Sequence, residues 1–173
     1  LNIPPTLQDS LMARLDRLQS GKRIAQSGAV IGREFSHELL AAVTALDDAT
    51  LQQGLQELRN AELIYKKGLT PHHHYIFKHA LVRDSAYQSL LKRQRQQLHQ
   101  HVAQVLETQF SEITLQNPEL LAQHYTEAGV IERALACWQQ AAEQAVTRSA
   151  MQEALTHINT VSYTHLTLPT SFL

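Results

Sequence analysis

The stretch YIFKHALVRDSAY, residues 75–87, contains the change of pattern that decides the fold. It begins with an apolar run of the kind found in β-strands. From His79 onward the apolar residues recur at helical spacing, with Val82 and Ala86 on one stripe. We therefore predict a short strand followed by a helix over residues 79–91, with a histidine at the changeover.

A β-hairpin is predicted just before this changeover. Residues 63–65 and 75–77 are both β-prone, and the connection between them contains Gly68 and Pro71. The same connection carries three consecutive histidines, residues 72–74. Adjacent residues of a strand point to opposite faces, so three such rings cannot easily share one metal ion. No Cys or carboxylate stands nearby to complete a site, and we predict a solvated loop without a metal.

Three helices are predicted before the hairpin. The first covers residues 22–31 and ends at Gly32. The second is capped by Ser36, and the third begins after Asp47 or Asp48. Their apolar positions at helical spacing are Phe35, Leu39, Leu40 and Val43 in the second helix, and Leu51, Leu55 and Leu58 in the third.

Further helices are predicted on both sides of this central part. Leu7, Leu11 and Leu15 recur at helical spacing near the start of the chain. Apolar residues at the same spacing mark a helix over residues 94–109. Residues 111–117 are polar and predict a break after it.

The C-terminal part is predicted to form helical hairpins. Pro118 favours the first turn of a helix, and Gly129 favours its end. The predicted inward positions are Leu121, Tyr125 and Ala128 in this helix, Ile131, Leu135, Trp138, Ala142 and Ala145 in the next, and Ala150, Ala154 and Ile158 in a third. His99 and His101 lie two residues apart and share no helix face, so we interpret both as surface residues.

The composition favours a mainly α protein of the cytoplasm. Of 173 residues, 43% are hydrophobic, while only 6 are Gly and 5 are Pro. No apolar run approaches the roughly 20 residues of a membrane span. The single cysteine, Cys137, excludes an internal disulfide and a Cys-based zinc site. The net charge of -1 gives no nucleic-acid footprint.

Three strings resemble STAND-class signalling ATPases. In the first, Phe77, His79 and Leu81 match the end of the winged-helix module of that class, although Ala80 stands where an Asp is common. The string GAVIGREF, residues 28–35, is similar to large bacterial proteins that fuse an ATPase module to helical repeats, sometimes behind a class III nucleotide cyclase. The string HYTEAGVIERALACWQQAAEQA, residues 124–145, resembles tetratricopeptide-type repeats.

The resemblance implies an architecture of several parts. Residues 1–20 would be a linker helix from a missing ATPase core, and residues 21–92 a winged-helix-like domain with a short β-hairpin. Residues 93–160 would form tetratricopeptide-like hairpins. Residues 161–173 include VSYTHLTLPT, which resembles a translated sequencing adapter, so we expect this tail to be read-through rather than native sequence.

The resemblance also implies a function for His79. In this class the histidine reaches the β-phosphate of nucleotide bound to the ATPase core and helps to hold a closed state. The ordinary alternative is that His79 only caps a helix or lies half-buried in a core. ATP or ADP with Mg would be bound by the parent protein, and the repeats would bind a protein partner or ligand.

No catalytic residue is predicted in this chain. It contains no Gly-x-x-x-x-Gly-Lys-Ser/Thr loop, and no Ser/His/Asp set or carboxylate pair with suitable spacing. The predicted function is nucleotide-state sensing and partner binding. The alternatives are a DNA-binding winged-helix regulator and a helical scaffold without a nucleotide link. DNA binding is disfavoured because the helix after Asp47 or Asp48 has one cation, Arg59, and groove binding usually needs several.

Overall fold

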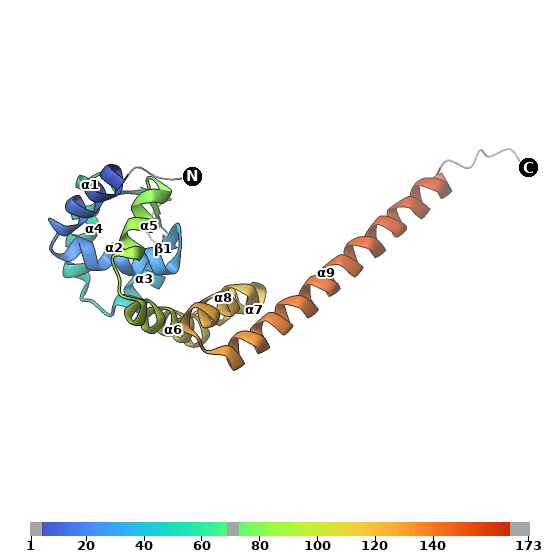
Figure 1. The fold of residues 1–173 in the computed structure, drawn as a ribbon. Helices are drawn as coiled ribbons and strands as arrows, with labels where there is room; N and C mark the ends of the chain where they lie inside the picture. The colour runs from blue at the N-terminus through green and yellow to red at the C-terminus, as the bar shows by residue number, and fades with distance from the viewer. Residues whose placement is uncertain (1–4, 69–72, 167–173) are drawn as a thin grey trace, which may run out of the picture.

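A computed structural model gives the fold, and it describes the backbone of residues 5–68 and 73–166 (Figure 1). Side chains are described for residues 9–68, 73–152 and 155. The elements are α1 (Pro5–Asp16), α2 (Ser20–Ile31), β1 (Glu34–Ser36), α3 (His37–Thr44), α4 (Asp48–Asn60), β2 (Ile64–Lys67), β3 (His74–Phe77), α5 (Ala80–Gln88), α6 (Lys92–Gln109), α7 (Ser111–Gln116), α8 (Pro118–Ala128) and α9 (Ile131–Leu166). The prediction of a mainly α fold with a short β-hairpin is confirmed.

The sheet has three antiparallel strands in the order β1-β3-β2. In its register Phe35 lies opposite Tyr75, and Ile64 lies opposite Phe77. Strand β1 was not predicted, and the assignment of Phe35 to a helix is wrong. Ser36 is extended and accepts a hydrogen bond at Oγ from the Leu39 N–H at 3.1 Å. It therefore caps α3 as predicted, and the residue before it lies outside the helix.

A first hydrophobic cluster fills the part of the molecule that contains the sheet. The Phe35 ring packs there against two others. Its centroid is 5.6 Å from that of Phe77 and 6.1 Å from that of Tyr75. Helices α2 and α4 approach closely because Gly54 has no side chain. A Cβ at that position would meet the Ile24 side chain and would lie 3.0 Å from the Ser20 backbone. Asp47, rather than Asp48, caps α4 by accepting the Thr50 N–H at 2.9 Å.

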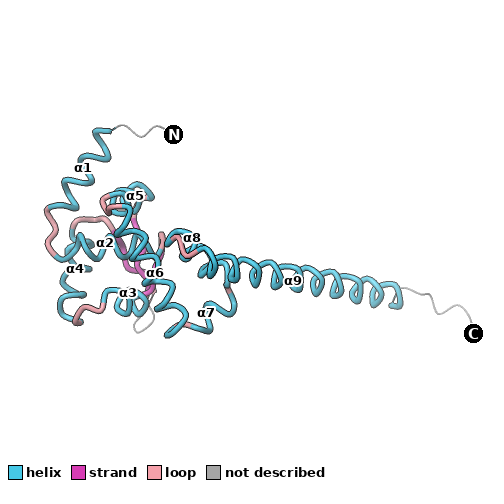
Figure 2. Tube along the Cα trace, turned by 60° about the horizontal axis from the view of Figure 1, so that its bottom comes forward, coloured by secondary structure: helices cyan, strands magenta, loops and turns pink. Residues whose placement is uncertain are grey.

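A second cluster joins α6, α8 and α9 to the outer faces of α2 and α3. Its members are Val30, Leu39, Val43, Val102, Ala103, Val105, Leu106, Leu121, Tyr125 and Ala134. The predicted break after residue 109 is present at Phe110, where α6 ends, but residues 111–116 form the short helix α7. Thr114 is buried in this helix, while the other residues of α7 are exposed. Figure 2 shows the small sheet beneath α5, and the strands contact α2, α3, α4 and α5.

Helix α9 differs from the prediction in length. Two helices were expected after Gly129, but one helix of 36 residues runs from residue 131 to residue 166. No Gly or Pro interrupts that stretch, so nothing in its backbone chemistry ends the helix. The helix projects well beyond the rest of the molecule (Figure 1). None of the described helices combines the length and the apolar character that a bilayer span needs.

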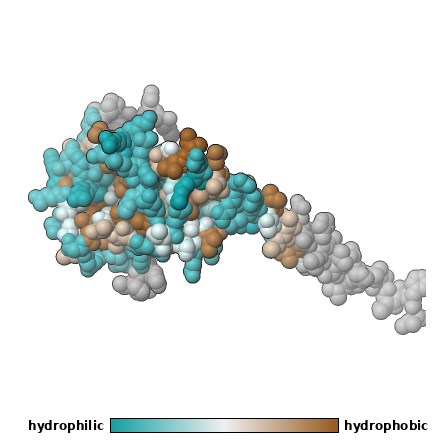
Figure 3. All heavy atoms as spheres, turned by 90° about the horizontal axis from the view of Figure 1, so that it is seen from below, coloured by the Kyte–Doolittle hydropathy of each residue, from teal (hydrophilic) through white to brown (hydrophobic). Residues whose placement is uncertain are grey.

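The inward face of α9 is also not the predicted one. Ile131, Leu135 and Trp138 were expected to face inward, but all three are exposed, whereas Ala134 is only 5% exposed. Gly129 adopts the left-handed conformation with φ 77° and closes α8, and the Val130 N–H then bonds the Tyr125 carbonyl at 3.0 Å. This turn places the smaller side chain of Ala134 against α8. Hydrophobic side chains remain on the surface where α9 leaves the body (Figure 3).

Candidate functional site

His79 lies where the sequence predicted it, between β3 and α5. Its backbone is extended, with φ -135° and ψ 145°, and it occupies the N-cap position of α5. The ring is exposed and forms no capping hydrogen bond with the first turn. Helix α5 packs against α1, the helix through which the chain enters this part of the fold (Figure 1). The ring is therefore accessible to another molecule or to a part of the protein outside the described residues.

The three consecutive histidines do not form one group. His72 lies outside the described residues. His73 is buried and stacks on His37 with ring centroids 4.7 Å apart, so the prediction of a solvated loop is wrong there. His74 is exposed, and its Nδ1 is 3.8 Å from a Glu34 carboxylate oxygen. The opposite orientations of His73 and His74 follow the strand alternation. Across the described side chains, no three His, Cys, Asp or Glu residues are grouped as metal ligands would be.

A second group of histidines was missed by the sequence reasoning. His99 is 6% exposed and His124 is 4% exposed, so the interpretation of His99 as a surface residue is wrong. His99 precedes the buried Val102 by three residues, and His124 follows the buried Leu121 by three. This spacing places each ring on the inward face of its helix. It is the feature of the sequence from which burial of the two rings could have been predicted. His101 is exposed, as predicted.

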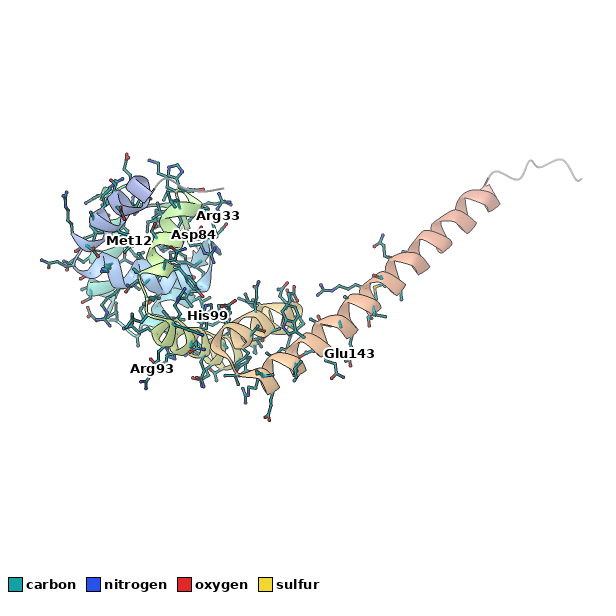
Figure 4. All side chains as sticks on the ribbon, in the orientation of Figure 1. Met12, Arg33, Asp84, Arg93, His99 and Glu143 are labelled. Atoms are coloured by element: carbon teal, nitrogen blue, oxygen red, sulfur yellow. The ribbon has the colours of Figure 1, made fainter. Side chains whose placement is uncertain are left out.

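Hydrogen bonds connect the two rings to two other side chains. The Nδ1 atoms of His99 and His124 are 2.9 Å apart, and His99 Nε2 is 3.0 Å from the Tyr87 hydroxyl. That hydroxyl donates to Glu127 at 3.5 Å. We call these four residues the junction network, because they join α5, α6 and α8. Figure 4 shows His99 on α6, at the place where the sheet-containing part meets the later helices.

One assignment of protons satisfies every bond in the junction network. His124 Nδ1–H donates to His99 Nδ1, His99 Nε2–H donates to Tyr87, and the Tyr87 hydroxyl donates to Glu127. Both imidazoles are neutral in this arrangement.

Burial determines the protonation chemistry of these groups. It lowers the pKa of His124 to about 4, with a further lowering from the neighbouring His99. Burial also lowers the pKa of His99, although the Glu127 carboxylate partly opposes that shift. The pKa of Tyr87 is raised, first by burial and then by Glu127. The site is therefore arranged to hold neutral imidazoles near pH 7.

A pocket of about 320 Å³ opens beside the junction network. Its wall includes Gly32 at the end of α2 and Arg83 on α5. The Arg83 guanidinium donates to the Ala29 carbonyl and to the Asp84 carboxylate, both at 3.4 Å. The pocket gives water and small polar groups a route to the imidazoles.

A second hollow, of about 430 Å³, lies between α4 and the hairpin. Arg59 of α4 lines it together with Lys66 and Lys78, which belong to the hairpin and its exit. This grouping was not predicted, because Lys66 and Lys78 lie outside the helix that carries Arg59. Lys78 is already paired with Glu62 at 3.3 Å, which offsets part of the positive charge.

Comparisons with known proteins give one alignment. An uncharacterized protein of Rhizobium meliloti (strain 1021) is 26% identical to the chain over 145 residues. The aligned stretch covers 83% of this chain and 14% of that protein, so the chain spans about a seventh of the relative's length. No protein-family model and no solved structure matches the chain. The alignment therefore assigns no activity to this protein.

Proposed function

We propose that this chain is the regulatory segment of a STAND-class signalling ATPase. Residues 21–92 would form its winged-helix-like unit, and residues 93–160 would begin its tetratricopeptide-like repeats. The order helix, strand, helix, helix, strand, strand from α2 to β3 is consistent with a winged helix. The greater length of the aligned relative supports a role as one segment of a larger protein.

The exposed ring of His79 at the start of α5 is the observation that carries the proposal. A helix N-terminus attracts anions because its first backbone N–H groups point outward and the helix dipole is positive there. The α5 N-cap side chain does not bond those groups. In the proposed complex, His79 contacts a nucleotide phosphate held by the preceding ATPase core, and no catalytic residue comes from this chain.

The proposed work of this segment is conformational and takes place in the cytoplasm. Contact of His79 with ADP favours a closed state in which the winged-helix-like unit lies on the core. A protein partner that binds the helical part favours the open state. The two events are then coupled through one equilibrium, so partner binding weakens ADP retention.

The proposal is tested in the full-length parent protein with the substitution His79→Ala. Loss of one hydrogen bond to a charged phosphate costs about 1.5–3 kcal/mol, so ADP should dissociate roughly 10- to 100-fold more readily. His74→Ala is the matched control, because His74 is another exposed histidine at the edge of the same hairpin. Unchanged ADP affinity in His79→Ala would defeat the assignment. Equal melting temperatures of the two variants would confirm that the effect is local.

Nucleic-acid binding is the second candidate function. The observation in its favour is the hollow where Arg59, Lys66 and Lys78 come together. It ranks second because Glu62 already pairs with one of these cations. A gel-shift titration with duplex DNA at two salt concentrations tests it, because phosphate-driven binding weakens steeply as salt rises.

A further inference from the structure

The junction network contains a contact that depends on the number of protons present. We propose that the His99–His124 pair is a pH-sensitive contact, and that proton uptake by the pair loosens α6 from α8. This inference goes beyond the proposed function and does not rest on it. It requires only this chain and its own titratable groups.

The contact between the two rings depends on how many protons they hold. Two Nδ1 atoms 2.9 Å apart can share only one hydrogen, because two N–H groups cannot face each other at that distance. One extra proton can bind His124 Nε2, which leaves the N–H···N bond between the two rings intact. It nevertheless places a full charge on two rings that are almost wholly buried. A second proton sets donor against donor and breaks the contact.

The pair lies where three helices meet. His99 is on α6 and bonds Tyr87 of α5 on one side and His124 of α8 on the other. Each bond therefore joins helices that are separate in the sequence. When His99 takes up a proton at Nδ1, the bond to His124 is lost, whereas its Nε2–H still donates to Tyr87. The pocket beside the pair lets protons arrive without unfolding of the chain.

Charged side chains near the pair affect its protonation. Arg83 of α5 and Arg95 of α6 oppose a proton on His99, and Glu127 of α8 favours one. Helix α2 presents the side chains of Val30 and Ile31 to the pocket. Among the described side chains, α3, α7 and α9 add no charge to this set. The carboxylate cannot cancel the cost of burial, which is the largest cause of the shift for both rings.

The direction of the pH effect follows from the lowered pKa values. The unfolded chain takes up protons on these histidines near pH 6.5, whereas folded His124 does so near pH 4. The stability that the neutral pair contributes is therefore complete above about pH 6.5 and is lost as the pH falls toward 4. For His124 alone, the unfolding equilibrium constant should rise roughly 50-fold between pH 7 and pH 4.5.

The test compares His124→Gln with His101→Gln in the full 173-residue chain. His101 is the control because it is an exposed histidine on α6. Unfolding by urea at pH 7 and pH 4.5 is followed through the fluorescence of Trp138, the single tryptophan. Its indole N–H bonds Thr126 of α8 at 3.1 Å, so it reports on α8. We expect the unfolding equilibrium constant of His101→Gln to rise between pH 7 and pH 4.5 as much as that of the wild type. For His124→Gln the rise should be at least tenfold smaller. Equal losses in both variants would overturn the proposal.

A second measurement needs no variant and decides the question if His124→Gln fails to fold. The ring signals of all 10 histidines are followed by NMR from pH 7.5 to 4. We expect two rings to stay neutral well below pH 6.5. Their protonation should coincide with faster amide hydrogen exchange in α6 and α8, after correction for intrinsic rates. If every ring titrates near pH 6.5 while the exchange rates stay unchanged, the pair is not a pH-sensitive contact.

Discussion

The sheet-containing part, α1 to α5, and the later helices, α6 to α9, are stabilised in different ways. The first is built around the rings of Phe35, Tyr75 and Phe77 and a set of buried leucines. The second contains smaller apolar residues and has two imidazoles buried between its helices. Apolar burial is non-directional, whereas hydrogen bonds fix distance and orientation. The later helices are thus joined by a hydrogen bond between two buried rings as well as by apolar packing.

A second polar group shows the same difference. The Tyr125 hydroxyl donates to Glu107 at 2.6 Å, and Arg133 donates to Glu107 at 2.7 Å and to Tyr125 at 2.9 Å. These three residues connect α8, α6 and α9. The second hydrophobic cluster also includes Val30 and Val43 from the first part. The later helices therefore complete their core with residues of α2 and α3, and we expect the chain to unfold as one unit.

The largest expected effect comes from removing an aromatic ring of the first part. Phe77→Ala should lower the free energy of unfolding by about 3–5 kcal/mol, because Phe77 is fully buried and its loss leaves a cavity. Tyr65→Ala is the control, since Tyr65 is exposed on the neighbouring strand. Urea denaturation followed by circular dichroism measures both. A cost below 1 kcal/mol for Phe77→Ala would mean that the rings do not form the core of this part.

A somewhat smaller effect is expected from the second cluster. Leu106→Ala should cost about 2–5 kcal/mol, because Leu106 is buried on α6. The transitions seen by circular dichroism and by Trp138 fluorescence should coincide, since the two parts share core residues. Leu115→Ala, an exposed position on α7, is the control. Separate transitions would show that the later helices unfold alone.

Local chemistry made much of the first part predictable from the sequence. The hairpin, the cap at Ser36 and the changeover at His79 each depend on a few neighbouring residues. Strand β1 was missed because three residues carry no detectable alternation, and only pairing with β3 makes them a strand. The confirmed features are therefore those that residues close together in the sequence determine.

Long-range contacts account for what the sequence could not supply. The junction network joins residues from three helices, and no spacing rule within one helix brings His99 to His124. The rotation of α9 was equally hidden, because apolar residues occur on two of its faces. The larger ones were taken as inward, but close packing on α8 selects the face with Ala134. Size at a helix contact, rather than hydrophobicity alone, decides which face is buried.

The smallest expected effects test this orientation of α9 with two adjacent substitutions. Ala134→Leu should cost about 1–3 kcal/mol, because added volume at a buried contact forces α8 and α9 apart. Leu135→Ala should change the free energy of unfolding by less than about 0.5 kcal/mol, because Leu135 is 63% exposed. Both are measured by urea denaturation at pH 7, where the two imidazoles of the junction network are neutral. The reverse ranking would mean that the apolar face predicted from the sequence is the one that packs on α8.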